Sequence, residues 1–206
     1  MSFTLGVYDL FAYAIPGSLY GTLLYYVAAR AGWLSRNGVD ANGLAVLVVA
    51  AVASYLLGHL TFGLGRTLAR AVPRRLHSQD EARRKFVARA PDAAGRGYLA
   101  ADAGVLRAAV EHALPEATVE VSRLQATGLM LRGSAPALLL GAAVALVEVI
   151  TGPEPLLAAC ATPLLLAAAG AALLGGRRLS VWADLRLLEL CYWLPSMDRF
   201  DAPPGA

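Results

Sequence analysis

The sequence predicts an all-α integral membrane protein with four transmembrane helices, a cytoplasmic helical segment between the second and third of them, and a C-terminal interfacial amphipathic helix. Three observations lead to this prediction: an apolar composition, four apolar runs of bilayer length and an uneven distribution of arginine. Of the 206 residues, 57% are hydrophobic and 16% are charged, whereas soluble domains carry about 25% charged residues. The mean hydropathy of +0.54 excludes a disordered chain, which needs low hydrophobicity. Two cysteines are too few for a disulfide-stapled secreted module.

Four apolar runs meet the length of about 20 residues that a membrane-spanning helix needs. They comprise residues 10–29, 43–65, 133–151 and 155–176. The rest of the chain is too short to shield these four runs from water in a soluble fold. Glycine and proline at 152–155 should join the third and fourth runs by a tight turn. A re-entrant pair would need the same turn, but we favour four full crossings. The first run is too long for a signal peptide and no basic residue precedes it, although residues 29–31 resemble a cleavage site.

Arginine and lysine predict the orientation, because these residues stay on the cytoplasmic side of a span. Residues 66–132 hold twelve of the eighteen basic residues, whereas the loop between the first two runs holds two. The predicted organisation is a transmembrane hairpin at 1–65, a cytoplasmic helical segment at 66–132, a second transmembrane hairpin at 133–176 and a cytoplasmic tail at 177–206. Both termini would then face the cytoplasm of a cell whose inner or plasma membrane holds the chain.

The lipid bilayer is the first partner that this pattern predicts. Four arginines flank the predicted spans and should contact anionic headgroups: Arg74, Arg75, Arg177 and Arg178. A nucleic acid is a poor candidate, because single-strand binding uses aromatic side chains among the basic ones. Between residues 66 and 132 only Phe86 and Tyr98 are aromatic.

The cytoplasmic segment should form short helices. Ser78 and Glu81 have the spacing of a capping box, which predicts a helix from Ser78 to Ala90. A second helix is predicted from Tyr98, and a third that starts near Pro115 should lead into the third span. The apolar stripe of the second helix includes Leu99, Leu106 and Val110. We favour packing of these stripes against each other, with a docking face for a cytosolic partner or a second copy as the alternative.

Ionisable and polar side chains inside a bilayer are functional candidates, because burying them there is costly. His59 lies in the second run and could relay a proton or bind an ion, although a hydrogen bond to a neighbouring span is the more common role. Tyr13 and Tyr20 lie seven residues apart on one face of the first run and could line a conduit or pack between helices. Glu148 is expected to be solvated at the outer boundary, and Asp9 to cap the first helix.

Small residues predict close helix packing. Gly17 and Gly21 form a GxxxG pair beside Pro16, and Gly141 belongs to a similar pattern in the third run. In the tail, residues 180–194 place Trp182, Leu188 and neighbouring apolar residues on one broad face. This pattern is typical of a helix lying on the inner leaflet. A helix that covers the cytoplasmic segment is the alternative.

No enzyme signature is present: the sequence has no HExxH, Walker loop, GxSxG or CxxC motif. We therefore expect no catalytic residue, no cofactor and no metal site. The leading hypothesis is a membrane scaffold or subunit that recruits a cytosolic partner or forms a homo-oligomer. The alternative is an oligomeric pore, a small transporter or a membrane-disrupting effector, in which His59 and the tyrosines face the conduit.

Overall fold

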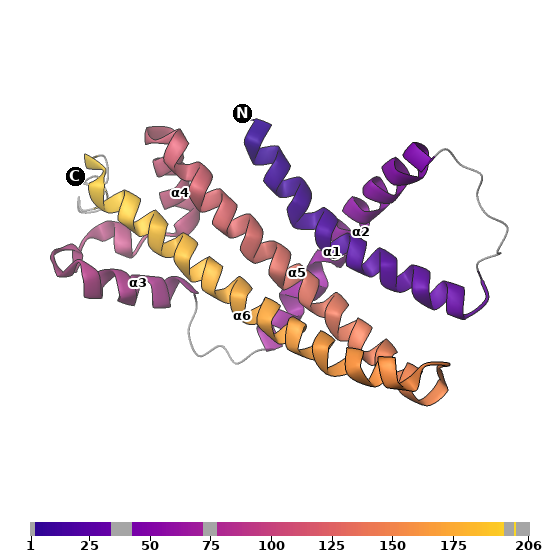
Figure 1. Cartoon of the computed structure of the whole chain (residues 1–206). Coiled ribbons are helices and arrows are strands. Elements are labelled where there is room, and N and C mark those ends of the chain that lie inside the picture. The colour runs from indigo at the N-terminus through magenta and orange to yellow at the C-terminus, as the bar shows by residue number, and fades with distance from the viewer. Residues whose placement is uncertain (1–2, 34–42, 72–77, 196–199, 201–206) are drawn as a thin grey trace. The chain divides into compact units, whose positions relative to one another are not determined.

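A computed structural model describes residues 3–33, 43–71, 78–195 and 200 of the chain (Figure 1). Every element in these residues is a helix, which confirms the all-helical prediction. In chain order they are α1 (Phe3–Arg30), α2 (Gly43–Ala71), α3 (Ser78–Arg89), the 3-10 turns η1 (Pro91–Ala93) and η2 (Gly97–Leu99), α4 (Ala103–Ala113), α5 (Pro115–Thr151) and α6 (Pro155–Trp193).

Three helices in the described residues are long and apolar enough to cross a membrane. They are α2, which contains the apolar window Val46–Gly63, together with α5 and α6, and their mean hydropathies are 1.9, 1.9 and 2.1. The predicted membrane character is confirmed at this level. Helix α1 has 28 residues and is not one of the three.

Helices α5 and α6 are longer than the apolar runs that predicted them. Helix α5 begins at Pro115, where proline suits the first turn because it lacks an N–H that would need a partner. It runs 37 residues without interruption to Thr151, and residues 152–154 then form the turn that the sequence predicts. Helix α6 runs 39 residues from Pro155 to Trp193, so the predicted tail helix at 180–194 is its continuation and no separate element.

The chain divides into two compact units, each of which takes residues from two parts of the sequence. Unit 1 comprises Met1–Pro73 and Leu129–Gly176, and unit 2 comprises Arg74–Gly128 and Arg177–Ala206. Helices α5 and α6 therefore contribute residues to both units.

In unit 1, α1 packs against α2 and lies beside α5. A β-carbon placed on Gly133 of α5 would lie 3.1 Å from Cγ of Pro16 in α1. Helices α5 and α6 are antiparallel neighbours, because Arg132 donates a hydrogen bond to the Gly176 carbonyl at 3.3 Å. The prediction that Asp9 caps the first helix is wrong, since α1 already begins at Phe3.

In unit 2, α3 covers the predicted helix 78–90, but the second predicted helix begins later than expected. Residues 97–99 form the turn η2, and α4 starts only at Ala103. Asp102 is its N-cap: the Asp102 carboxylate accepts a hydrogen bond of 2.7 Å from the Gly104 N–H. The expectation of a helix from Tyr98 is therefore wrong, because an aspartate that satisfies a free N–H at the start of a helix fixes that start.

The core of unit 2 joins α3, α4 and the end of α6. It contains Phe86 from α3, Leu106 and Val110 from α4, and Val181, Leu185, Leu187, Leu188 and Cys191 from α6. The prediction that the tail helix lies on the inner leaflet stays a prediction, although Val181, Leu185, Leu188 and Cys191 of its apolar face are buried in this core. The alternative, a helix that covers the cytoplasmic segment, agrees with the structure.

Candidate functional site

The crossing of α1 and α2 brings two backbones together at a pair of glycines. A β-carbon on Gly17 would lie 1.7 Å from the Ser54 carbonyl oxygen, and one on Gly58 would lie 1.9 Å from the Tyr13 carbonyl oxygen. Each glycine thus faces a carbonyl group of the other helix, a geometry in which Cα–H groups contact C=O groups. Only glycine fits at either position.

Of the three glycines predicted to mediate packing, Gly17 has that role. The space around Gly21 is open, with nothing within 4 Å of an added β-carbon, and Gly141 makes an ordinary contact of 3.6 Å with Leu165. Sequence reasoning missed Gly58. The signal was present, because Ser54 and Gly58 have the i, i+4 spacing that puts two small residues on one helix face.

An aromatic cluster lies beside this crossing and contains His59. The ring centroids of Tyr13 and His59 are 4.0 Å apart, and Tyr55 and Phe62 complete the cluster at 6.1 and 5.7 Å from Tyr13. His59 itself is exposed on α2. The structure therefore brings two of the predicted intramembrane residues together, in an arrangement that can pack an imidazole against phenol rings.

Tyr20 does not join this cluster. Its side chain is buried, and among the described residues its hydroxyl has no hydrogen-bond partner. That Tyr13 and Tyr20 line a conduit stays a prediction.

An ion pair links the ends of α1 and α5. Arg30 Nε donates to a Glu148 carboxylate oxygen at 2.9 Å, and Arg30 also donates to the Thr151 carbonyl at 3.1 Å. Glu148 is only 13% exposed. The expectation that Glu148 is solvated is wrong, because Arg30 covers it. Two of the few charges near the predicted outer boundary thereby neutralise each other.

The apolar stripe that was predicted to bind a partner, in the segment between α2 and α5, is covered by other helices of unit 2. Leu106 and Val110 are buried, and Leu99 packs against the same core. The favoured interpretation, mutual packing of the stripes, is confirmed for these residues. Arg107 strengthens the contact of α4 with α5 by donating to Gln125 and, at 2.9 Å, to Ser122.

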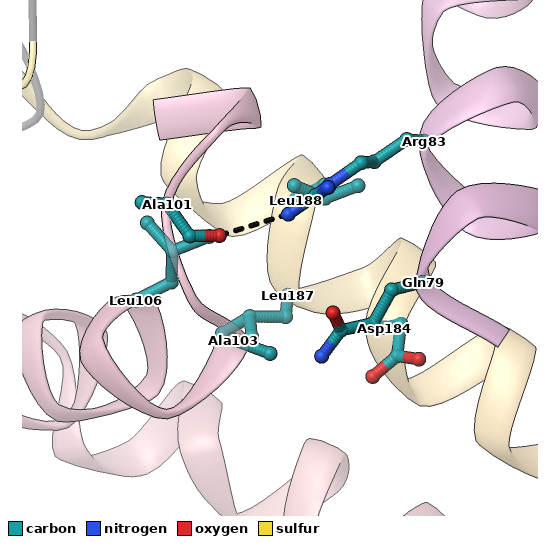
Figure 2. Close-up of a pocket in the computed structure, with 8 residues that line it drawn as sticks. All are labelled: Gln79, Arg83, Ala101, Ala103, Leu106, Asp184, Leu187 and Leu188. Carbon is teal, nitrogen blue, oxygen red and sulfur yellow. Dashed lines mark hydrogen bonds between the residues drawn. The ribbon is translucent and has the colours of Figure 1, made fainter. Parts of the chain in front are cut away.

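A small cavity lies next to this core (Figure 2). It has a volume of about 20 Å³. Its lining combines the polar residues Gln79, Arg83 and Asp184 with the apolar residues Ala101, Ala103, Leu106, Leu187 and Leu188. Arg83 donates to the Ala101 carbonyl at 2.9 Å, the bond drawn in the figure. A cavity of this size can hold one water molecule and is too small for a substrate.

A larger groove of about 450 Å³ opens on another side of unit 2. Its lining combines apolar side chains with charged ones from three helices, namely Arg89 of α3, Glu120 and Leu124 of α5, and Trp182, Leu185, Arg186 and Glu189 of α6. Sequence reasoning assigned Trp182 to a membrane surface and did not single out the charged residues. The helical spacing of Trp182, Arg186 and Glu189, by four and three residues, was the signal available.

The charged lining forms one connected network. Arg186 pairs with Glu120 at 3.4 Å and with Glu189 at 3.0 Å, while Arg89 pairs with Glu189 at 3.3 Å. Because these groups are largely exposed, the network contributes little to stability. The network lies along the groove and connects α3, α5 and α6 within unit 2.

The arginines predicted to contact headgroups have different surroundings. Arg177 pairs with Glu81 at 3.3 Å, whereas Arg178 is exposed. The hydrogen bond from Lys85, with the charges of Lys85 and Arg177, holds the pKa of the Glu81 carboxyl below its ordinary value. Arg74 and Arg75 lie outside the described residues.

The two cysteines differ in environment, and this difference predicts their reactivity. Cys160 is exposed, whereas burial raises the pKa of the Cys191 thiol to about 11. The thiolate is the reactive form, so Cys191 should carry roughly 100-fold less of it at neutral pH than an ordinary thiol. A Cys160→Ser chain in mild detergent should therefore resist maleimide and take up one label after denaturation in SDS, as mass spectrometry can measure. Rapid labelling of the folded chain would show that Cys191 is accessible.

Within the part of the chain that the structure describes, no three histidine, cysteine, aspartate or glutamate side chains gather as metal ligands would. Comparison of the chain with protein-family models, with curated proteins and with solved structures finds no match.

Proposed function

We propose that this chain is a four-span membrane protein of the cell membrane, with both termini and unit 2 in the cytoplasm. The placement of α1 as a fourth span is supported by its contacts with α5. Pro16 lies against Gly133, and Arg30 reaches Glu148 and Thr151. Helix α1 therefore runs beside the apolar part of α5 and in the same direction, so that a bilayer crossed by α5 also encloses α1.

The function that the geometry supports best is that of a non-enzymatic membrane scaffold or subunit, in which unit 2 makes the protein contacts. The observation that carries this proposal is the groove of unit 2, where Trp182 is 61% exposed beside fixed charges. Tryptophan and arginine are enriched where protein contacts contribute most binding energy.

The test is photo-crosslinking in intact cells from probes incorporated in unit 2. A probe at Glu120, on the groove, should attach the chain to another polypeptide, whereas a probe at Glu111, exposed on α4 outside the groove, should do so far less. If neither probe captures a polypeptide and the chain is monomeric in mild detergent, the scaffold proposal is wrong.

A second function, an oligomeric pore or small transporter, is favoured by one observation. His59 is an ionisable group in the apolar part of α2, with its ring in tilted contact with that of Tyr13, and such groups often mark ion pathways. Proteoliposomes of the wild-type chain should then pass ions that those of His59→Ala do not. Equal, background-level flux from both would remove this candidate.

A further inference from the structure

Two neighbouring arginines at the end of the apolar run of α6 have different surroundings. Helix α6 continues without a break from this run into unit 2 (Figure 1), and Arg177 and Arg178 are its first two residues there. Arg177 pairs with Glu81 of α3 at 3.3 Å. Arg178 is exposed, and no carboxylate among the described residues pairs with it. The charge of Arg178 is therefore available to a molecule outside the chain.

Trp182 lies one helical turn beyond Arg178. The two residues are four apart, so they share one face of α6. Trp182 is 61% exposed, whereas its neighbour Val181 is buried in the core of unit 2. This face of α6 thus presents a positive charge next to a large ring that has an apolar body and a polar N–H.

Both residues lie close to the apolar run along the helix axis. The run ends at Gly176, and the helical rise places Cα of Arg178 about 3 Å and Cα of Trp182 about 9 Å beyond that residue. Side chains of an α-helix lean towards its N-terminus and cover the preceding turn. In α6 this direction leads back to the apolar run, so the guanidinium and the indole lie nearer to the run than their Cα atoms do.

The headgroup layer of a bilayer crossed by α6 lies at this level. It adds roughly 5–8 Å on each side of the hydrocarbon. Tryptophan is enriched in this layer, because its ring can contact acyl carbons while its N–H stays among polar groups. A basic residue there attracts anionic lipids, and the planar guanidinium of arginine can donate two parallel hydrogen bonds to a phosphate.

We infer that Arg178 and Trp182 bind the headgroup of an anionic phospholipid, in the leaflet at this end of α6. The Arg178 guanidinium donates to the phosphate, and the Trp182 indole lies among the glycerol and the first acyl carbons. This inference rests on the proposed membrane topology, in which the leaflet is the inner one, and it adds a lipid to the proposed scaffold function. Trp182 also lines the groove of unit 2, so a protein bound in the groove would contact the lipid as well.

An acidic protein segment is the competing occupant of this face. The two arginines of the groove, Arg89 and Arg186, already pair with carboxylates of the chain. An acidic segment lying along the groove would therefore find only Arg178 at its end. A phospholipid matches the face better, because its one phosphate suits the one available guanidinium and its acyl chains suit the indole.

Fluorescence quenching of a single tryptophan tests the lipid site. The full-length chain with Trp33→Phe and Trp193→Phe retains Trp182 as its one tryptophan. In proteoliposomes, phosphatidylglycerol brominated on its acyl chains should quench Trp182 with an apparent affinity about five-fold above that of brominated phosphatidylcholine, which is the preference that one basic residue at the surface provides.

Substitutions of Arg178 separate its charge from a structural role. In the chain that retains only Trp182, Arg178→Gln should abolish the preference for phosphatidylglycerol, whereas Arg178→Lys, which keeps the charge, should retain most of it. Arg123→Gln is the matched control and should leave the preference unchanged, because Arg123 is exposed on α5 and does not line the groove.

Equal quenching by the two brominated lipids before any change at Arg178 would overturn the inference. Capture of a polypeptide by a photo-probe in place of Trp182, with no quenching by either lipid, would show that a protein covers the indole and would overturn it too. The Glu120 probe tests the scaffold function separately. A lipid preference without capture at Glu120 supports the headgroup site and removes the scaffold, and capture without a lipid preference does the reverse.

Discussion

Replacing Gly58 or Gly17 with leucine should force α1 away from α2 and lower the thermal stability of unit 1. The carbonyl oxygens of Tyr13 and Ser54 would lie 1.9 and 1.7 Å from the new β-carbons, far inside contact distance, so the two backbones must separate. Overpacking of this kind costs about 1–3 kcal/mol and occasionally more. For a chain of this size that cost corresponds to a fall of roughly 3–10 °C in the unfolding midpoint.

Two matched positions provide the controls for this prediction. Gly21 on α1 and Gly63 on α2 have nothing within 4 Å of an added β-carbon, so Gly21→Leu and Gly63→Leu should leave the midpoint within about 2 °C of the wild type. The midpoint can be followed by size-exclusion chromatography of heated, detergent-solubilised protein. Equal midpoints for Gly17→Leu and Gly21→Leu would show that the helices do not meet where the structure places them.

The second large effect is expected in unit 2, where Val110→Asp should prevent the apolar core from forming. Val110 is fully buried among apolar side chains of α3, α4 and α6, and an unpaired buried carboxylate costs about 3–5 kcal/mol. Val105→Asp is the matched control, because Val105 lies on the same helix and is 53% exposed.

Cys191 reports on this loss of structure, because it belongs to the same core. In the Cys160→Ser background, Val110→Asp should expose Cys191 to maleimide and to faster proteolysis between α3 and α5, whereas Val105→Asp should leave both unchanged. Protection of Cys191 in Val110→Asp would mean that α4 is not part of the core.

The positions of the long helices were predictable because each depends on the composition of its own segment and not on distant residues. A run of about 20 apolar residues requires an apolar environment whatever the rest of the chain does, and the turn at 152–154 follows from its glycine and prolines. Helix ends were less predictable. The start of α4 depends on one hydrogen bond, in which the Asp102 carboxylate accepts from the Gly104 N–H. The apolar stripe alone allowed an earlier start, at Tyr98.

The candidate site was harder to predict, because it depends on pairs of residues far apart in sequence. Glu148 appeared to be a solvated carboxylate until Arg30, 118 positions earlier, was found beside it. Trp182 and Leu188 belong to one apolar stretch of α6, yet α3 and α4 bury only Leu188 and leave Trp182 exposed. Helical periodicity identifies a face but not which part of that face another helix covers.

In the proposed topology, unit 2 faces the cytoplasm while the α1–α2 and α5–α6 connections face the outside. The most direct test of this topology is labelling of single cysteines by a membrane-impermeant maleimide, in cells carrying the full chain with Cys160→Ser. Trp33→Cys, beyond the end of α1, and Glu154→Cys, between α5 and α6, should be labelled in intact cells. Ala88→Cys, exposed on α3, should be labelled only after the membrane is permeabilised. Labelling of Ala88→Cys in intact cells, with Trp33→Cys protected, would contradict the four-span topology and the functions proposed on it.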